Sequence, residues 1–335
     1  MSSLDAETTE AVRSSLREMF AGDRLDLPAS LAALGWDDVV AEDPATATTL
    51  LFVEHGRALA TSRALNSVIC SALALDDAHT ILLPGTDGLG SVATGDTTAT
   101  GLVLGGLGVG GLGVGGLIDG DPAGRITVPV GTGDGVVLVA VDADPQPDAA
   151  PGFDPGSSVT RCTVALPASI SGPTVSTTAW AASIAAAQRA TAAEIVGVCT
   201  SALELAVAHT RAREQYGRPI GAFQAVRHRM SECHAAIESA KDTLRAAWVT
   251  TEDIGWAATV AKARAGRTQA EVMRHCIQVF GAMGLTEESD LHRYVTRAAA
   301  LDGLLGGHLD LSVQLGDALL AGEPVHPVAR IKETT

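Results

Sequence analysis

One short stretch, residues 211–226, gathers side chains suited to binding a phosphorylated ligand. It reads Arg-Ala-Arg-Glu-Gln-Tyr-Gly-Arg-Pro-Ile-Gly-Ala-Phe-Gln-Ala-Val. Arg213 supplies a planar guanidinium, which binds phosphate oxygens through paired, charge-assisted hydrogen bonds. Around it stand an aromatic ring and two amides, those of Gln215, Tyr216 and Gln224. The alternative is that Arg213 only pairs with a nearby acid such as Glu214 on a solvated face.

Helical patterns on both sides must position this stretch. Apolar residues recur at steps of three and four from Ile195 to Ala206, and again from Phe223 to Trp248. That spacing is typical of one helix face. We expect Gly217 to end the first helix and Pro219 to start the second, since glycine tolerates a left-handed cap and proline suits a first turn. Two long helices joined so closely should fold back as an antiparallel pair within a bundle.

The length, charge and cysteines of the chain exclude some classes of protein. A chain of 335 residues with 46% hydrophobic content can form more than one core. Its net charge of −16 argues against a nucleic-acid partner, because phosphate binding needs clustered basic residues. The five cysteines share no metal-like spacing, so no metal site is predicted. Cys199, Cys233 and Cys276 lie on apolar helix faces, which indicates core residues in a reducing compartment.

The changing pattern along the chain predicts an α+β fold that is mainly α. We expect an N-terminal helical domain over 1–76, a small antiparallel β domain over 77–170, and a helical bundle over 171–335. Within the first of these, Glu54 and His55 are expected at exposed polar positions between apolar ones. The polar, acidic N-terminus does not resemble a secretory signal, so a cytoplasmic location is expected.

A glycine-rich segment from Gly101 to Ile118 interrupts the middle region. It matches the pattern G-x-G-x-x-G, yet more glycine follows where a dinucleotide-binding helix would have to open. Half of its residues are glycine, which makes it too weakly hydrophobic to span a membrane. We therefore expect neither a dinucleotide fingerprint nor a membrane span here.

The pattern R-x-Q-[FY]-G-x-P-I-x-x-F-Q in residues 213–224 is similar to the signature of the acyl-CoA dehydrogenases. These are flavoenzymes that oxidise acyl-CoA thioesters to the 2,3-enoyl form. The resemblance implies a helical N-terminal domain, a small central β domain and a C-terminal four-helix bundle. It also implies that Arg213 grips the FAD pyrophosphate. The residues implied along the adenine-side half of the cofactor are Gln215, Tyr216 and Gln224.

A second motif supports the same resemblance. Residues 278–284 read Gln-Val-Phe-Gly-Ala-Met-Gly, similar to the family's Q-x-x-G-G-x-G turn. In the family this turn meets the adenine end of FAD from a neighbouring subunit, so Gln278, Gly281 and Ala282 join the predicted cofactor residues. The alternative is that Gly281 merely caps the end of a helix.

The family's catalytic carboxylate has no counterpart in this sequence. Counting from Arg297, the resemblance places it at Gly306. Some relatives carry the base on an earlier helix, and the matching residue here is Gln188, whose amide cannot take a proton at neutral pH. No catalytic residue is therefore predicted, with His308 and Glu194 remaining as alternative bases. The flavin-ring motifs of the family's central domain are also missing.

What is kept and what is lost divide by location. The kept residues are those the family extends to a neighbour's FAD, whereas the lost ones serve a subunit's own flavin ring and substrate. The resemblance is thus strongest to the non-catalytic subunit of heteromeric α2β2 acyl-CoA dehydrogenases, which actinobacteria use on steroid side chains. It implies FAD shared at the subunit interface, a homologous partner that carries the glutamate, an acyl-CoA substrate, and an electron-transfer flavoprotein as acceptor. Rival readings are a homomeric dehydrogenase with an unrecognised base, a flavin-free scaffold, and a non-redox enzyme on this fold.

Overall fold

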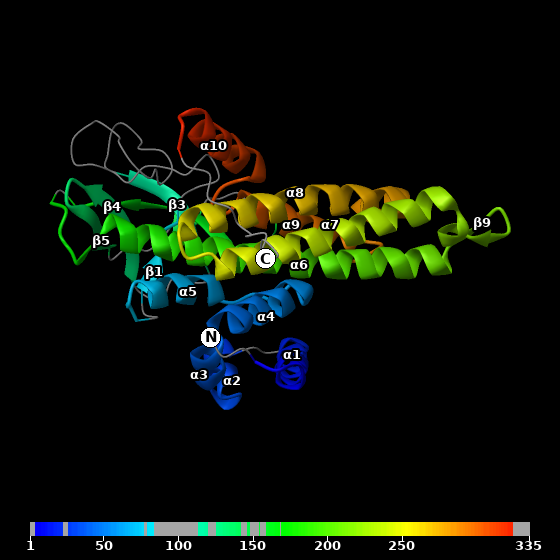
Figure 1. The fold of residues 1–335 in the computed structure, drawn as a ribbon, viewed down its shortest axis with the longest axis horizontal. Helices are drawn as coiled ribbons and strands as arrows, with labels where there is room; N and C mark the ends of the chain where they lie inside the picture. Colours follow the sequence, from blue (N-terminus) through cyan, green and yellow to red (C-terminus); the bar gives the residue numbers. More distant parts are fainter. Residues whose placement is uncertain are drawn as a thin grey trace, which may run out of the picture.

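The computed structural model describes residues 4–22, 26–76, 79–83, 113–119, 125–141, 146–147, 154, 159–167 and 169–323. These residues are mostly helical, with a small β region, as the sequence predicts. The long helices of the C-terminal half run side by side as a bundle (Figure 1). The sheets lie beside one end of this bundle, and a short hairpin projects from the opposite end.

The N-terminal part consists of short helices. Their bounds are α1 Ala6–Phe20, α2 Leu27–Ala33, α3 Trp36–Glu42, α4 Pro44–Arg57 and α5 Ala64–Ala72. Side-chain caps explain three of the starts, because the carboxylates of Asp5, Asp26 and Asp43 each accept a hydrogen bond from a backbone amide three residues on. The helices α4 and α5 then pack against the first helix of the bundle.

Within the described residues, the β region beside the bundle consists of two small sheets. The first has the strand order β1–β4–β5–β8, with bounds His79–Ile81, Arg125–Thr132, Gly135–Val141 and Thr174–Val175. The second joins β3 Gly113–Asp119, β7 Val159–Ala165 and β6 Gln146–Pro147. The expectation of a purely antiparallel domain is wrong in one place, since β1 pairs with β4 in parallel. Of the glycine-rich segment, residues 101–112 lie outside the described part, and Gly113 to Ile118 run within β3.

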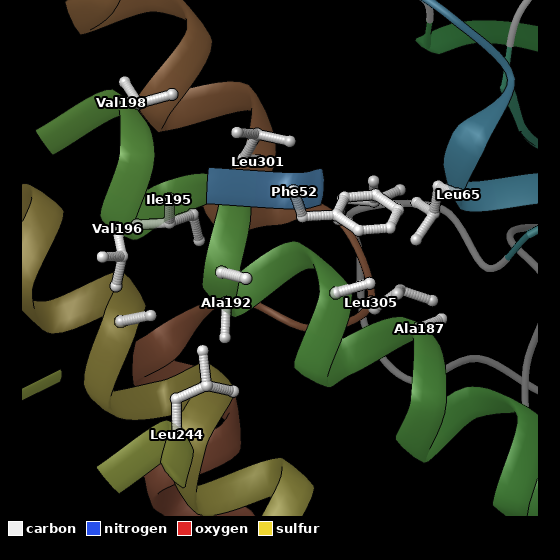
Figure 2. Close-up of a cluster of buried hydrophobic side chains, with 14 of the residues drawn as sticks. Phe52, Leu65, Ala187, Ala192, Ile195, Val196, Val198, Leu244, Leu301 and Leu305 are labelled. Carbon is white, nitrogen blue, oxygen red and sulfur yellow. The ribbon is translucent and has the colours of Figure 1, made fainter. Parts of the chain in front are cut away.

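The C-terminal part is a bundle centred on one long helix. Its members are α6 Thr177–Ala212, α7 Gln224–Val249, α8 Ile254–Phe280, α9 Leu291–Gly303 and α10 His308–Leu320. As the periodicity predicts, α6 and α7 form an antiparallel pair (Figure 1). Figure 2 shows Ile195 and Val196 of α6 within the main core, together with Phe52, Leu244 and Leu301 from other helices. The predicted core cysteines, Cys199, Cys233 and Cys276, are fully buried.

The helix α6 also has the length and hydropathy of a membrane span. In this protein 78% of its apolar window is buried inside the structure. A central bundle helix, enclosed by apolar neighbours, has the same composition as a membrane helix. Its length and hydropathy alone are therefore weak evidence for a membrane location.

The helices α4 and α6 cross with their backbones in contact. A Cβ atom on Gly197 would lie 2.1 Å from the carbonyl oxygen of Val53, and one on Gly56 would lie 2.2 Å from that of Glu194. Real Cβ atoms do not approach so closely, so only glycine fits at either position. This crossing brings the polar side chains beside Gly56 into the protein interior.

We expect Gly197→Ala to lower the stability of the chain by about 3 kcal/mol, because overpacking must push α4 and α6 apart. The melting temperature should fall by roughly 5–10 °C, followed by circular dichroism. Gly316→Ala is the matched control, since that helical glycine has open space around its Cβ position. This control should be neutral or slightly stabilising, as alanine favours a helix over glycine. Equal melting of both variants would contradict the close crossing.

Candidate cofactor-binding site

The corner between α6 and α7 is a β-hairpin. The helix α6 ends at Ala212, and two short antiparallel strands follow, β9 Glu214–Gln215 and β10 Arg218–Pro219. Tyr216 and Gly217 form the turn with φ angles of +54° and +76°. Two positive φ values are typical of a type I′ turn, which suits the twist of a tight hairpin. The hairpin separates the helices, so the expectation that Gly217 caps α6 is wrong.

The start of α7 also differs from expectation. A single 3-10 turn, η1 Ile220–Ala222, follows the hairpin, and α7 begins at Gln224 with Phe223 as its N-cap. Pro219 lies in β10 and not in the first turn of the helix. Its fixed φ suits an extended strand end as well as a helix start, so the sequence could not separate the two.

Arg213 stands at the junction of helix and hairpin. It is the C-cap of α6, its amide donates to the carbonyl oxygen of His209 at 2.8 Å, and its side chain is exposed. Within the described residues the Arg213 guanidinium makes no ion pair. The side-chain amide of Gln215 donates a hydrogen bond to the backbone oxygen of Glu214. The alternative that Arg213 pairs with Glu214 therefore gains no support. The guanidinium is available to bind an anion from outside.

Aromatic and cationic groups line the hairpin beside Arg213. The Tyr216 ring is 94% exposed and meets the Phe223 ring edge-on, with centroids 6.2 Å apart. The guanidinium of Arg218 lies over the same Phe223 ring at 4.2 Å. Gln224 is exposed at the start of α7, where its amide nitrogen lies 3.4 Å from His228 Nε2. An exposed ring and amides of this kind can contact a heterocycle, such as a purine, that approaches from solvent.

The second predicted segment lies at the end of α8. Gly281 is the C-cap, with φ +64° and ψ −141°, and its amide donates to Ile277. That conformation is confined largely to glycine, and a Cβ there would meet nothing within 4 Å. Gly281 does cap the helix, as the alternative held, and the surrounding space also leaves its backbone open to a ligand. Gln278 and Ala282 are exposed on either side of it.

Both segments lie at the same end of the bundle. The rings of His209, near the end of α6, and Phe280, the last residue of α8, stack with centroids 4.2 Å apart and an interplanar angle of 16°. The helices α6 and α8 therefore deliver Arg213 and Gln278 to one region, beyond which the β9 hairpin projects (Figure 1). The group faces outwards, so it can hold one half of a cofactor but cannot enclose a whole one. The expectation that these residues meet the FAD of a neighbouring chain stays a prediction.

The two positions of the family's base lie close together in the buried interior. Gly306 has a φ of +100°, and a Cβ there would lie 2.6 Å from Cδ2 of Leu311. Gln188 is 3% exposed, and its amide nitrogen donates to the Leu305 oxygen at 3.2 Å. Thr259 in turn donates to the Gln188 side-chain oxygen at 3.3 Å. The amide is thus held by neutral partners, and neither position offers a group that takes a proton.

A buried lysine contacts the turn between α9 and α10, which contains Gly306. The sequence pattern did not single out this lysine. Lys262 of α8 is 0% exposed, and its ammonium donates to the backbone oxygens of Asp302 at 2.8 Å and Gly306 at 3.0 Å. Burial lowers the pKa of Lys262 to about 8, partly opposed by the Asp302 carboxylate. The one hint in the sequence is that Lys262 lies between two alanines. Helical spacing alone places Lys262 on the core face. Lys262 therefore holds the α9–α10 turn that contains Gly306.

The stability of the chain is expected to depend on the charge of Lys262. The folded-state pKa lies below the ordinary value of 10.5, so the unfolded chain binds more protons between pH 8 and 10.5. Stability therefore rises with pH across this window, by an amount on the order of 3 kcal/mol. The measurement is the free energy of urea unfolding at several pH values for the wild type and Lys262→Met. The variant should lose this part of the slope, and parallel pH curves would contradict the assignment.

The two alternative bases are both engaged elsewhere. His308 Nδ1 lies 2.6 Å from a carboxylate oxygen of Asp302 at the start of α10. Glu194 is 6% exposed, with Oε1 at 3.2 Å from His55 Nδ1 and 3.5 Å from Arg297 Nη1. Glu194 thus lies in a buried ion-pair cluster, whereas His308 forms a partly exposed pair with Asp302. In the part of the chain that the structure describes, no group of three or more His, Cys, Asp or Glu could hold a metal ion.

The expectation that Glu54 and His55 are exposed is wrong. Glu54 is 2% and His55 3% exposed, because the close α4–α6 crossing encloses both sides of Gly56. Arg17 Nε donates to Glu54 at 3.0 Å, which compensates the buried carboxylate. Polar residue types alone gave no sign of this crossing.

Comparisons with known proteins agree with this fold. Residues 179–310 match the description acyl-CoA dehydrogenase, C-terminal domain. Acyl-CoA dehydrogenase FadE34 of Mycobacterium tuberculosis is 40% identical over 124 residues, which cover 35% of this chain and 17% of that protein. Acyl-CoA dehydrogenase IpdE2 of Mycolicibacterium smegmatis is 34% identical over 115 residues, which cover 34% of this chain and 36% of that protein. The matched stretch is thus well under half of each relative.

Solved structures extend the likeness to almost the whole chain. A variant of the Tcur3481–Tcur3483 steroid acyl-CoA dehydrogenase has a TM-score of 0.71 at 22% identity, covering 94% of this chain and 98% of that one. The ChsE4–ChsE5 complex from Mycobacterium tuberculosis gives 0.69 at 20%, covering 96% and 99%. A structure described as the electron transferring flavoprotein of Acidaminococcus fermentans gives 0.68 at 17%, covering 96% and 100%.

The chain has the acyl-CoA dehydrogenase fold, with a small β region and a C-terminal helical bundle. Residues 179–310 resemble the C-terminal domain of the acyl-CoA dehydrogenases, and the matched stretch is about two fifths of this chain.

Proposed function

We propose that this chain is the non-catalytic subunit of a heteromeric, FAD-dependent acyl-CoA dehydrogenase. One observation carries the proposal: the outward-facing group around Arg213 is intact, whereas both positions for a base hold residues that cannot take a proton, Gly306 and Gln188. Two solved structures with the same fold, Tcur3481–Tcur3483 and the ChsE4–ChsE5 complex, support a partner subunit. A homologous partner subunit would supply the missing carboxylate.

In such a complex the residues of this chain bind and orient the cofactor. The exposed guanidinium of Arg213 neutralises the pyrophosphate and fixes it through paired hydrogen bonds. Tyr216, with Gln215 and Gln224, borders the adenine side, and the backbone at Gly281 lets that end approach α8 closely. When bound, FAD supplies the hydride acceptor for desaturation of an acyl-CoA thioester at C2–C3. The proton would leave to the partner's base, because this chain has none placed to receive it.

The proposed substrate and electron acceptor are inferred from proteins that share this fold. One relative of the same fold is described as a steroid acyl-CoA dehydrogenase, which supports a CoA thioester of a steroid side chain. An electron-transfer flavoprotein is proposed as the electron acceptor. The fully buried Cys199 and Cys233 are in no disulfide, as expected in the reducing cytoplasm where we place the complex.

Co-expression with a homologous chain that carries the glutamate tests the proposal. The expected result is a stable complex that holds FAD, while this chain purified alone is colourless. Flavin counting per pair of chains and turnover of an acyl-CoA with an artificial electron acceptor are the measurements. A yellow, active protein from this chain alone would support a homomeric dehydrogenase instead. A complex without FAD would support a flavin-free scaffold, and product formed without any acceptor would indicate a non-redox enzyme.

A further inference from the structure

The two segments assigned to the cofactor are connected by a pair of stacked rings. His209 and Phe280 lie nearly parallel, with centroids 4.2 Å apart and an interplanar angle of 16°. Neither ring belongs to the residues that the family signature assigns to FAD. Both are half-buried, so the stack is a packing contact between α6 and α8 and not a surface feature.

Each ring belongs to a residue whose backbone adjoins a residue that would meet the cofactor. The carbonyl oxygen of His209 accepts the amide hydrogen of Arg213 at 2.8 Å, one helical turn further on. Phe280 directly precedes Gly281, whose amide closes the last turn of α8 onto Ile277. A shift of one ring relative to the other would therefore move Arg213 relative to Gln278 and Gly281.

The imidazole adds no charge to this region at neutral pH. Burial lowers the pKa of His209, and the neighbouring positive charge of Arg213 lowers it further. A neutral ring stacks on Phe280 without competing with Arg213 for an anion. Its role in the stack is thus geometric, and another flat apolar ring should replace it.

We propose that His209 is a positioning residue for the adenine half of FAD, holding Arg213 and the α8 end at a fixed separation through its stack on Phe280. This inference rests on the proposed function, because it needs FAD to bind across both segments. FMN contains the flavin ring and one phosphate but no adenylate half. A residue that positions both Arg213 and the α8 end therefore affects FAD much more than FMN, which lacks the adenylate half and one of the two phosphates.

The test uses the two-subunit complex, freed of flavin, and measures the Kd of FAD and of FMN by calorimetry. His209→Ala is expected to weaken FAD about tenfold, the upper range for one aromatic pair, while the Kd of FMN changes much less. His209→Phe keeps a flat ring in place and should restore the FAD affinity to about that of the wild type. Should the alanine variant fail to assemble, His209→Leu fills the space without stacking and takes its place.

Arg213→Ala, measured in parallel, separates the two levels of the proposal. If Arg213→Ala weakens FAD and His209→Ala does not, the positioning role is overturned and the proposed function stands. Equal weakening of FAD and FMN by His209→Ala indicates a general structural defect and also overturns it. If neither variant affects FAD, the proposed function itself fails.

Discussion

Arg213→Ala is expected to weaken FAD binding to the two-subunit complex by about 3 kcal/mol, or roughly a hundredfold in Kd. The guanidinium is exposed at the C-terminal end of α6 and makes no ion pair among the described residues, so its removal leaves the fold intact. The substitution removes the paired, charge-assisted hydrogen bonds that the guanidinium is proposed to donate to the pyrophosphate. The measurement is calorimetric titration of the flavin-free complex with FAD.

Two companion variants make this result specific. Arg213→Lys keeps the charge but not the planar fork, and should fall between wild type and alanine. Arg211→Ala removes an exposed positive charge two residues away at the same helix end. It should weaken FAD binding much less, because a charge outside the predicted phosphate contact acts only at long range, where salt screens it. If Arg211→Ala and Arg213→Ala weaken FAD binding equally, the effect of Arg213 is one of general positive charge and not of a specific contact. Full flavin retention in Arg213→Ala would refute the assignment.

Gly306→Glu is expected to create no dehydrogenase activity in this chain, although it restores the acid at the family's position. The backbone there has a φ of +100°, and a Cβ would lie 2.6 Å from the Leu311 side chain. Strain of a non-glycine residue and overpacking together should lower the stability by about 3 kcal/mol. The ammonium of Lys262 also holds the Gly306 oxygen at 3.0 Å, so the turn has little freedom to adapt.

The neighbouring glycine is a suitable control for this substitution. Gly307 does not have a positive φ, and the nearest atom to its Cβ position is a flexible Asp310 oxygen at 3.3 Å. Gly307→Ala should therefore melt close to the wild type, while Gly306→Ala already loses stability. Dehydrogenase turnover by purified Gly306→Glu, without a partner, would show that one missing carboxylate is all that separates this chain from a complete enzyme.

The sequence determined the class of fold and the location of the candidate site. Helical periodicity identified α6 and α7 and their antiparallel pairing, because burial of one face is a local, repeating signal. The spacing from Arg213 to Gln224 specified the candidate cofactor side chains, since a motif is read directly from residue order. The absence of an acid at Gly306 is likewise a matter of residue identity.

Tertiary structure alone decided the environment of those residues. A hairpin turn forms at Tyr216 and Gly217 where a helix cap was expected. The sequence could not distinguish the two, because both structures place a glycine at positive φ. The burial of Glu54 and His55 depends on Gly56 and Gly197 meeting across two helices that lie far apart in sequence. Lys262 and His209 act through such long-range contacts as well. Contacts between distant segments follow from three-dimensional packing, which no local pattern of residues records.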